Sequence, residues 1–303
     1  MFGMNPLNVL REKRANSMSF FYQIILLGTC LTLGACGGGG GSGAVSEETP
    51  ATPAAPSSST ASSGNSTAGD KAPGSSATGE VDNKTPKDIR RFDGALGQSV
   101  LQYTVGSNMK TVYSDELLTH PQMKAFYFAD QDMVFTVTRD GKEKQRSELR
   151  QYPEWSVADR HRLDATVTLT GTALNEYTWM QLHRKASTSV KPPLRLTWAK
   201  NQVIDGVSYP DYLVAVFYHP DSGYHKVPLM PRQDGPMTVS LEAYNYQVFI
   251  SLNGSLVHVE NVSDWAGHNC YFKLGVYASG SEAAYGQATV RYQEAAFSHS
   301  PGL

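Results

Sequence analysis

The sequence has too few cysteines for a disulfide-stabilised fold or for a zinc site built from paired cysteines. It contains three, Cys30, Cys36 and Cys270, and only Cys270 lies in a stretch with the composition of a folded domain. A single thiol has no partner within that domain, so no disulfide framework is available there. A lone cysteine can be a nucleophile or a small buried apolar residue, and we interpret Cys270 as the second.

The chain has no large excess of charge of either sign. Its formal net charge is −2, whereas nucleic-acid-binding proteins usually present a strongly basic face. We therefore expect no nucleic-acid partner, and any polyanion must be bound by a local group of cations. A phosphate-binding glycine loop and the HExxH zinc motif are also missing from the sequence, so we expect neither a cofactor nor a metal.

No apolar run near the N-terminus is long enough to span a bilayer, which takes ~20 residues. Residues 20–33 are apolar, follow a basic segment at residues 11–14, and end in small residues before Cys36. This order is typical of a secretory signal, and its ending resembles a bacterial lipobox, in which the cysteine is lipidated. Residues 1–36 are predicted to be a lipoprotein signal peptide, with Cys36 as the lipidation site. We expect a protein anchored by lipid to the bacterial cell envelope, at the outer membrane, or secreted.

Residues 37–87 have almost no large apolar side chains. They are mainly Gly, Ser, Ala, Thr and Pro, and such a segment cannot bury enough surface to offset the entropy lost on ordering. We interpret it as a disordered linker and residues 88–303 as one folded domain.

Short apolar runs alternate with turn residues in the predicted domain, as is typical of a β-sandwich. One hairpin is predicted from residues 133–138 and 144–151, and a second from residues 247–252 and 255–260 around Asn253-Gly254. Further strands are expected at residues 165–170, 177–184, 194–199, 212–218, 271–278 and 288–293, and brief helices only at residues 115–120 and 157–161. The predicted fold class is all-β, a jelly-roll sandwich of two antiparallel sheets.

Three of these strands place polar side chains on one face, because successive side chains of a strand point to opposite sides of a sheet. Strict alternation groups Tyr177 and Trp179 with Gln181 and His183, and it makes Phe272, Leu274, Val276 and Ala278 one apolar side. If the apolar sides face the core, one cationic and aromatic surface results. Its members are Arg146, Glu148, Arg150, Gln181, His183, Tyr271, Lys273 and Tyr277.

Each polar pattern alone also fits an exposed charge ladder, a hydrogen-bonded polar pair or an amphipathic edge strand. All three polar patterns lie on the strand faces opposite the apolar sides, and their occurrence together favours a binding cleft. Gly275 has no side chain and is expected to leave room on the floor of that cleft for a ligand.

The segments RSELR at residues 146–150, QLH at 181–183 and YFKLGVY at 271–277 occur in the order of the three signature strands of polysaccharide lyase family 7. The folded region resembles this family of alginate lyases. Leu182 stands where the family more often has Ile or Val, and Ala278-Ser279 replaces the usual Asn-Gln. These departures bear on substrate preference more than on chemistry. The resemblance implies a concave sheet that binds the polysaccharide and a β-elimination at a 4-linked uronic acid.

The resemblance also implies four catalytic residues. Arg146 and Gln181 would donate hydrogen bonds to the carboxylate of the substrate, which stabilises the charge that forms when the C5 proton leaves. His183 and Tyr277 would remove that proton and protonate the departing glycosidic oxygen. Which of the two is the base stays open.

Four further residues are expected to bind substrate or to support the site. Lys273 and Arg150 would supply positive charge and bind flanking carboxylates, and Glu148 would orient the two arginines, since a free carboxylate repels a polyuronate. Tyr271 would line the cleft.

The expected function is that of a monomeric, metal-independent lyase that cleaves an acidic polysaccharide, alginate, to unsaturated oligosaccharides. One alternative is a lyase for another polyuronate, such as glucuronan, and another is a non-catalytic carbohydrate-binding module on a lectin-like sandwich. A glycoside hydrolase on the same fold would need two carboxylates, and only Glu148 is acidic on the three polar faces. Mannuronate or guluronate preference and endo or exo action are left open.

Overall fold

The computed structural model describes residues 85–186, 190–279 and 285–300, and these form a sandwich of two antiparallel sheets. The all-β jelly-roll prediction is confirmed. The predicted signal segment, Cys36 and nearly all of the predicted linker lie outside the described residues. Within the described ranges, no helix is both long and apolar enough to cross a membrane.

One sheet has nine strands in the order β11-β10-β9-β8-β15-β5-β1-β2, with β6 paired to β15. Three strands of the predicted cleft, β8, β15 and β5, are adjacent at its centre, so residues far apart in the chain meet there. The bounds are β1 Ser99–Val105, β2 Asn108–Val112, β5 Gln145–Gln151, β6 Trp155–Ser156, β8 Glu176–Arg184, β9 Leu194–Ile204, β10 Val207–His219, β11 Gly223–Pro231 and β15 Asn269–Ala278.

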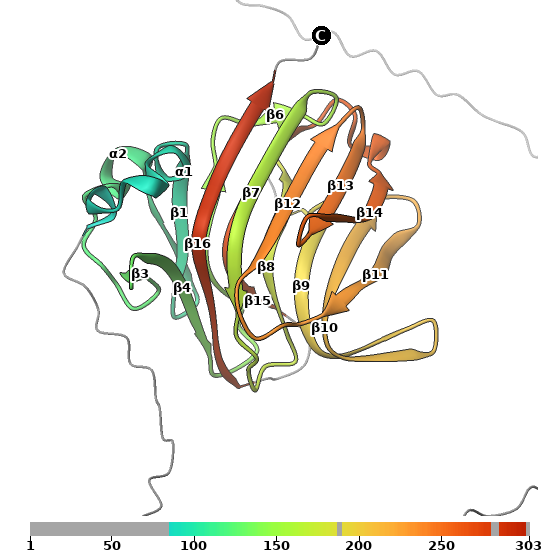
Figure 1. The fold of residues 1–303 in the computed structure, drawn as a ribbon, viewed down its shortest axis with the longest axis horizontal. Coiled ribbons are helices and arrows are strands. Elements are labelled where there is room, and N and C mark those ends of the chain that lie inside the picture. The colour runs from blue at the N-terminus through green and yellow to red at the C-terminus, as the bar shows by residue number, and fades with distance from the viewer. Residues whose placement is uncertain (1–84, 187–189, 280–284, 301–303) are drawn as a thin grey trace, which may run out of the picture. The chain divides into compact units, whose positions relative to one another are not determined.

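The second sheet has seven strands in the order β14-β13-β12-β7-β16-β4-β3. Figure 1 shows this sheet in front, with β8, β15, β9 and β10 of the nine-stranded sheet behind it. The bounds are β3 Phe126–Ala129, β4 Asp132–Arg139, β7 Arg160–Leu169, β12 Met237–Tyr244, β13 Gln247–Leu252, β14 Ser255–Asn261 and β16 Gly286–Ser300.

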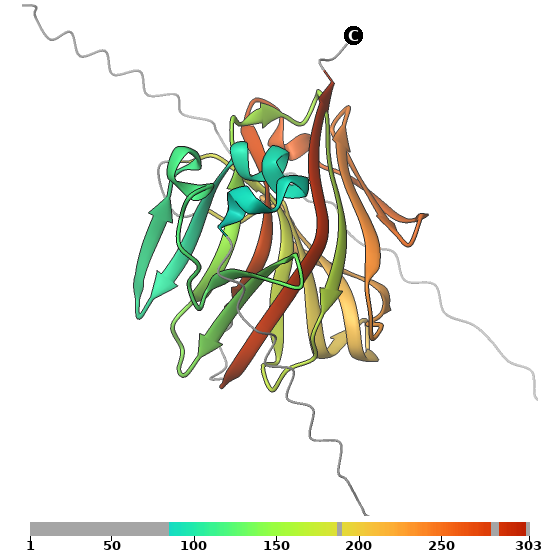
Figure 2. The same cartoon turned by 60° about the vertical axis from the view of Figure 1, so that its left-hand side comes forward.

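The few helices are short, and most of them lie before β3. They are η1 Pro86–Asp88, η2 Arg90–Phe92, α1 Asp93–Gly97, α2 Ser114–Leu117 and η3 Ser263–Trp265. Figures 1 and 2 show α1 and α2 beside β1 and β16, where they cover one side of the sandwich between the two sheets. The helix predicted at residues 115–120 is confirmed in part by α2. The one at residues 157–161 is wrong, because a turn there leads into β7 at Arg160.

One of the two predicted hairpins is wrong. Residues 133–138 and 144–151 do form strands, but β4 pairs with β3 and β16, whereas β5 pairs with β1 and β15 in the other sheet. The turn residues between them therefore carry the chain from one sheet to the other. The second hairpin is confirmed: β13 and β14 pair around Asn253-Gly254, both of which have positive φ.

The core lies between the sheets and is filled by the apolar sides of the strands. In β15, Phe272, Leu274, Val276 and Ala278 are all fully buried there, as the alternation predicts. The same alternation places Lys273 and Tyr277 on the outer face of the nine-stranded sheet.

Strict alternation fails in β8 because the strand contains a β-bulge. The register with β9 shifts between Thr178 and Met180, which makes Trp179 an extra residue. As a result Tyr177 and Trp179 are buried in the core, whereas Gln181 and His183 line the outer face. The prediction that all four share one face is therefore wrong for the first two.

Candidate active site

A cleft of about 1090 Å³ lies on the outer face of the nine-stranded sheet. Six of the eight residues predicted for the site line it: Arg146, Gln181, His183, Tyr271, Lys273 and Tyr277. The other two, Glu148 and Arg150, are neighbours of these residues in the strand register. The structure thus brings the three sequence segments to one groove.

Antiparallel pairing sets which side chains are adjacent. Lys273 on β15 lies between Arg150 of β5 and Gln181 of β8. Two other pairs complete the arrangement, Tyr271 with His183 and Tyr277 with Arg146. Since paired residues of a sheet point to the same side, these groups project together into the cleft.

Glu148 is buried beneath the cleft and is neutralised there. It is 2% exposed; one oxygen accepts a hydrogen bond from Lys273 Nζ at 2.7 Å and lies 3.8 Å from Arg146 Nη1. Its other oxygen accepts a hydrogen bond from Gln181 Nε2. A buried carboxylate needs such partners. Glu148 therefore orients Arg146, Gln181 and Lys273 from below.

Lys273 is equally buried, at 2% exposed. Burial lowers the pKa of its ammonium, while the charge of Glu148 acts in the opposite direction. With its ammonium held against Glu148, Lys273 can act on a substrate through its charge, and direct binding of a flanking carboxylate, as expected from the sequence, does not follow from this geometry.

Arg150 is held by a residue that the sequence reasoning missed. Its guanidinium donates a hydrogen bond to Glu154, and Lys185 Nζ lies 3.3 Å from the second oxygen of the same carboxylate. Arg150 Cζ also lies 3.9 Å from the centre of the Tyr271 ring. The prediction that Glu148 orients both arginines is therefore wrong for Arg150, which Glu154 fixes against Tyr271.

His183 has one nitrogen fixed and one free for chemistry. Its Nδ1 lies 2.9 Å from the carbonyl oxygen of Arg184, which can only accept a hydrogen bond, so Nδ1 carries the proton. The Tyr271 hydroxyl lies 3.2 Å from the same nitrogen. Burial and the charge of Lys273 lower the pKa of His183 to about 4. At neutral pH the imidazole is therefore uncharged, with the electron pair on Nε2.

Tyr277 lies against a cation. Arg146 Cζ is 4.8 Å from the centre of its ring, and both residues line the cleft. The guanidinium makes a cation–π contact with the ring and can hold a substrate carboxylate next to the phenol.

A row of paired residues continues the site across the sheet. Gln181 faces Arg195 on β9, Arg195 faces Val216 on β10, and Val216 faces Lys226 on β11. With neighbouring strands ~4.8 Å apart, Arg195 lies roughly 10 Å and Lys226 roughly 19 Å from Lys273 along this row. The sequence did contain the signal for Arg195, because residues 194–198 alternate apolar and polar side chains.

Glycine at position 275 has a different role from the one expected. A Cβ atom there would lie 2.3 Å from the carbonyl oxygen of Ser147 and 2.6 Å from Glu148 Cα. The space beside Gly275 is thus filled by the backbone of β5, and the prediction of room for a ligand is wrong. Glycine allows β15 and β5 to approach under the site.

Cys270 is fully buried, and burial raises the pKa of its thiol to about 12. Thiolate is the nucleophilic form of cysteine, so this environment agrees with the predicted apolar role.

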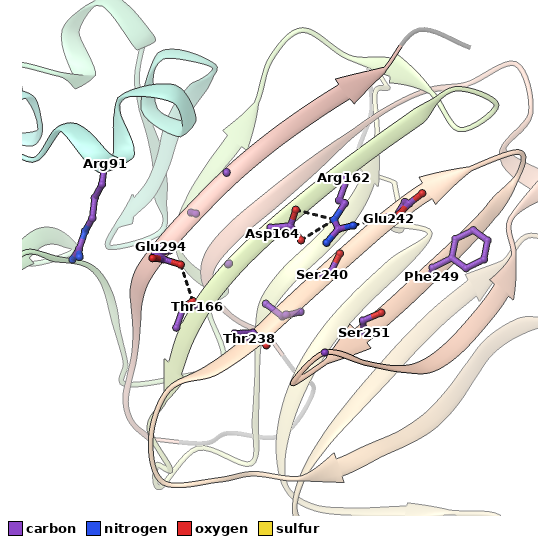
Figure 3. A pocket seen from close by; sticks show the side chains of 15 residues that line it. Arg91, Arg162, Asp164, Thr166, Thr238, Ser240, Glu242, Phe249, Ser251 and Glu294 are labelled. Atoms are coloured by element: carbon purple, nitrogen blue, oxygen red, sulfur yellow. Dashed lines mark hydrogen bonds and ion pairs between the residues drawn. The ribbon is translucent and has the colours of Figure 1, made fainter. Parts of the chain in front are cut away.

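A second cavity, of about 690 Å³, lies on the outer face of the seven-stranded sheet. Figure 3 shows its side chains, among them Arg162 bonded to Asp164 and Glu294 bonded to Thr166. Two cations and three carboxylates line it, Arg91 and Arg162 against Asp164, Glu242 and Glu294. A polyanion would gain little electrostatic attraction in this cavity, because its carboxylates outnumber its cations. The first cleft is therefore the candidate active site.

Comparison with known families decides the classification. The model of the alginate lyase family matches residues 96–299. The chain belongs to this family. It is thus a polysaccharide lyase of family 7, as the three strand motifs predict, and no curated protein sequence matches it.

Solved structures of alginate lyases share the fold of this lyase. Alginate lyase AlyC3 in complex with dimannuronate is 18% identical, with a TM-score of 0.63 over 74% of this chain and 99% of that one. A variant of the family 7 alginate lyase A1-II′ in complex with a product is 16% identical, with a TM-score of 0.59 over 70% and 99%. An alginate lyase from Pseudomonas aeruginosa is 21% identical, with a TM-score of 0.56 over 68% of this chain and 99% of that one.

Proposed function

We propose that this lyase cleaves alginate by β-elimination without a metal ion. The observation that carries the proposal is the charge of the cleft. Among its described lining residues, seven are Lys or Arg and one, Glu176, is acidic. A protein with a net charge of −2 thus concentrates positive charge along one groove, which suits a polymer with a carboxylate on each sugar.

The row from Lys273 through Arg195 to Lys226 gives the substrate a direction. A chain laid across the strands would meet positive charge at several successive positions, whereas one laid along a strand would leave the row. We place the reacting uronate over Arg146, Gln181, His183 and Tyr277, and the neighbouring sugars toward β9–β11. The complex of AlyC3 with dimannuronate supports a polyuronate as the ligand of this groove.

The chemistry follows from what each side chain can donate or accept. Arg146 binds the carboxylate of the reacting sugar and withdraws its charge, which makes the C5 proton more acidic. Gln181 keeps one amide hydrogen for the same carboxylate while the other is bonded to Glu148. Neutral His183 removes the C5 proton through Nε2, and Tyr277 donates its proton to the departing glycosidic oxygen.

The lowered pKa of His183 predicts the pH profile. The base must be unprotonated, so kcat/KM should be lost as the pH falls through the folded pKa of about 4, and not near the ordinary value of 6.5. We expect kcat/KM on a soluble oligouronate at pH 5.5 to stay within about twofold of its value at pH 7. An acid limb with its midpoint near 6.5 would contradict the lowered pKa of His183.

The substrate and the reaction are tested together with a panel of polymers. Polymannuronate, polyguluronate, mixed alginate and polyglucuronate are each incubated with the protein, and the ultraviolet absorbance of the unsaturated product is followed with and without a chelator. We expect absorbance to rise with an alginate polymer at the same rate in both conditions. New reducing ends without absorbance would indicate a hydrolase, and the absence of both signals would indicate a binding module.

A hydrolase is disfavoured by the structure of the cleft. Two carboxylates must flank the bond in that mechanism. Among the described residues of the site, Glu148 is buried against Lys273, and Glu176 lies 3.7 Å from Arg195 Nη1. Neither is a free acid or base above the floor of the cleft.

We also propose that the enzyme works at the cell envelope, held by lipid on Cys36. The order of basic, apolar and small residues before this cysteine supports the proposal. Cys36→Ser should move the protein from the membrane fraction to the soluble fraction while its specific activity stays unchanged. Retention of the variant in membranes would contradict the anchor.

A further inference from the structure

The strands that carry the candidate base and acid do not pair regularly. Leu274 of β15 pairs with Met180 of β8, but the next pair is Tyr277 with Thr178. Two residues of β15, Gly275 and Val276, thus stand opposite one of β8, Trp179. The ladder is interrupted at this β-bulge, directly under the cleft.

One hydroxyl group from the opposite sheet fills the interruption. The backbone N–H of Gly275 donates to the Tyr292 hydroxyl oxygen at 3.1 Å, and that hydroxyl donates to the carbonyl oxygen of Trp179. Tyr292 belongs to β16 and is fully buried, and its ring packs edge-on against Phe135 at 5.6 Å. Burial raises the pKa of the phenol, so it keeps its proton. Two backbone groups that would lack partners in the core are thereby satisfied.

The bulge decides which side chain lies next to Tyr277. From the pair Leu274–Met180, a regular antiparallel ladder would place Tyr177 opposite Tyr277. The β15 bulge puts Thr178 there instead, and the shift between β8 and β9 at the same place turns the ring of Tyr177 into the core. Thr178 of β8 and Arg146 of β5 thus flank Tyr277, and the guanidinium of Arg146 lies 4.8 Å from the centre of its ring.

We propose that Tyr292 is a positioning residue of the lyase: its hydroxyl holds the bulge that sets Tyr277 in register with Gln181 and His183. Tyr292 lies on the core side of the sheet and acts through the backbone of β8 and β15. The effect on turnover rests on the proposed function, whereas the role of the Tyr292 hydroxyl in holding the bulge does not.

Tyr292→Phe removes one oxygen atom and leaves the Gly275 N–H and the Trp179 carbonyl without this partner. A reacting group displaced by about 1 Å can lower the rate about 100-fold. We expect kcat to fall about 10- to 100-fold with KM within about twofold, because the displaced group acts in the reaction and the cationic floor is unchanged. The Gly275 amide should also exchange with solvent faster.

Tyr177→Phe is the matched control. The Tyr177 hydroxyl is likewise buried and donates to a backbone carbonyl, that of Thr170, at 2.9 Å. Both variants lose one buried hydroxyl, so both should show a lower Tm, but Tyr177→Phe should keep the kcat of the wild type and the protection of Gly275. Equal kcat in Tyr292→Phe and the wild type, or an equal loss in both variants, would overturn the inference.

Two arrangements keep the test decisive. Turnover is measured with whichever polymer of the panel the wild type cleaves, so failure on alginate counts against the proposed function, while Gly275 exchange still reports on the bulge. If Tyr292→Phe does not fold, exchange of the Gly275 amide in the wild type carries the test. It should be as slow as that of its ladder-paired neighbours in β15, and the fast exchange of an open amide would overturn the inference.

Discussion

Tyr277→Phe and His183→Ala are each expected to lower kcat about 10²- to 10⁴-fold while KM changes little, because each removes a group that moves a proton in the transition state. The phenol and the imidazole line one cleft, with Arg146 over the ring of Tyr277 and Nε2 of His183 free. The measurement is steady-state turnover on the preferred polymer, with the Tm of each variant recorded beside it.

Tyr244→Phe controls for the loss of a phenol near an arginine. Arg160 Cζ lies 4.5 Å from the ring centre of Tyr244, much as Arg146 lies over Tyr277, but Tyr244 belongs to β12 of the other sheet. Its turnover should equal that of the wild type. Full activity in folded Tyr277→Phe or His183→Ala would remove that residue from the mechanism.

Gly275→Ala should cost at least about 4 kcal/mol of unfolding free energy, a large part of the roughly 5–15 kcal/mol that holds a domain folded. The new Cβ would meet backbone atoms of Ser147 and Glu148 at 2.3 and 2.6 Å, and Gly275 has φ +139°. Since neither strand can move without breaking its ladder, we expect Tm to fall by about 8 °C or more and activity to be lost with it.

Gly206→Ala is the control that separates the collision of the new Cβ atom from the backbone strain of a positive φ. Gly206 also has positive φ, +81°, but no heavy atom lies within 4 Å of its ideal Cβ. This variant should cost only about 1–2 kcal/mol, with full activity. If Gly275→Ala were no less stable than Gly206→Ala in urea unfolding, the close approach of β15 and β5 would not be required.

The faces of the cleft strands could be predicted where those strands are regular. β5 and β15 pair without interruption from Lys273 to Ala278. Every second residue from Arg146, and every second residue from Tyr271, therefore lies on the face that strict alternation predicts. The same count failed at Tyr177 and Trp179, because a bulge lies between them and Gln181. The Tyr292 hydroxyl, more than a hundred positions away in the chain, donates to the Trp179 carbonyl at this irregularity, and local alternation carries no trace of it.

The wrong hairpin has a similar cause. The turn-forming residues after Arg139 do predict a reversal, but partners for both strands come from elsewhere: Arg139 pairs with Gly286, and Gln145 pairs with Ala278. A short connection with turn residues is compatible with one sheet or with two. Only the long-range pairing decides between them.

The partners of the charged side chains could not be predicted from residue types either. A glutamate on a strand face with two arginines was expected to be solvated or to orient both. The structure buries Glu148 and supplies Lys273, Arg146 and Gln181 as partners, whereas Arg150 is held by Glu154 in the loop after β5. Residue types predicted a site in this place, but pairings between strands decide which carboxylate holds which cation.

The most direct test of the central claim is the mass balance of a single cleavage. A purified mannuronate or guluronate oligomer of defined length is incubated with the protein, and the two products are weighed by mass spectrometry. Elimination adds no water, so the account predicts that the product masses add up to the mass of the substrate, with one product unsaturated. Two products whose masses together exceed the mass of the substrate by one water would show hydrolysis and would contradict the account.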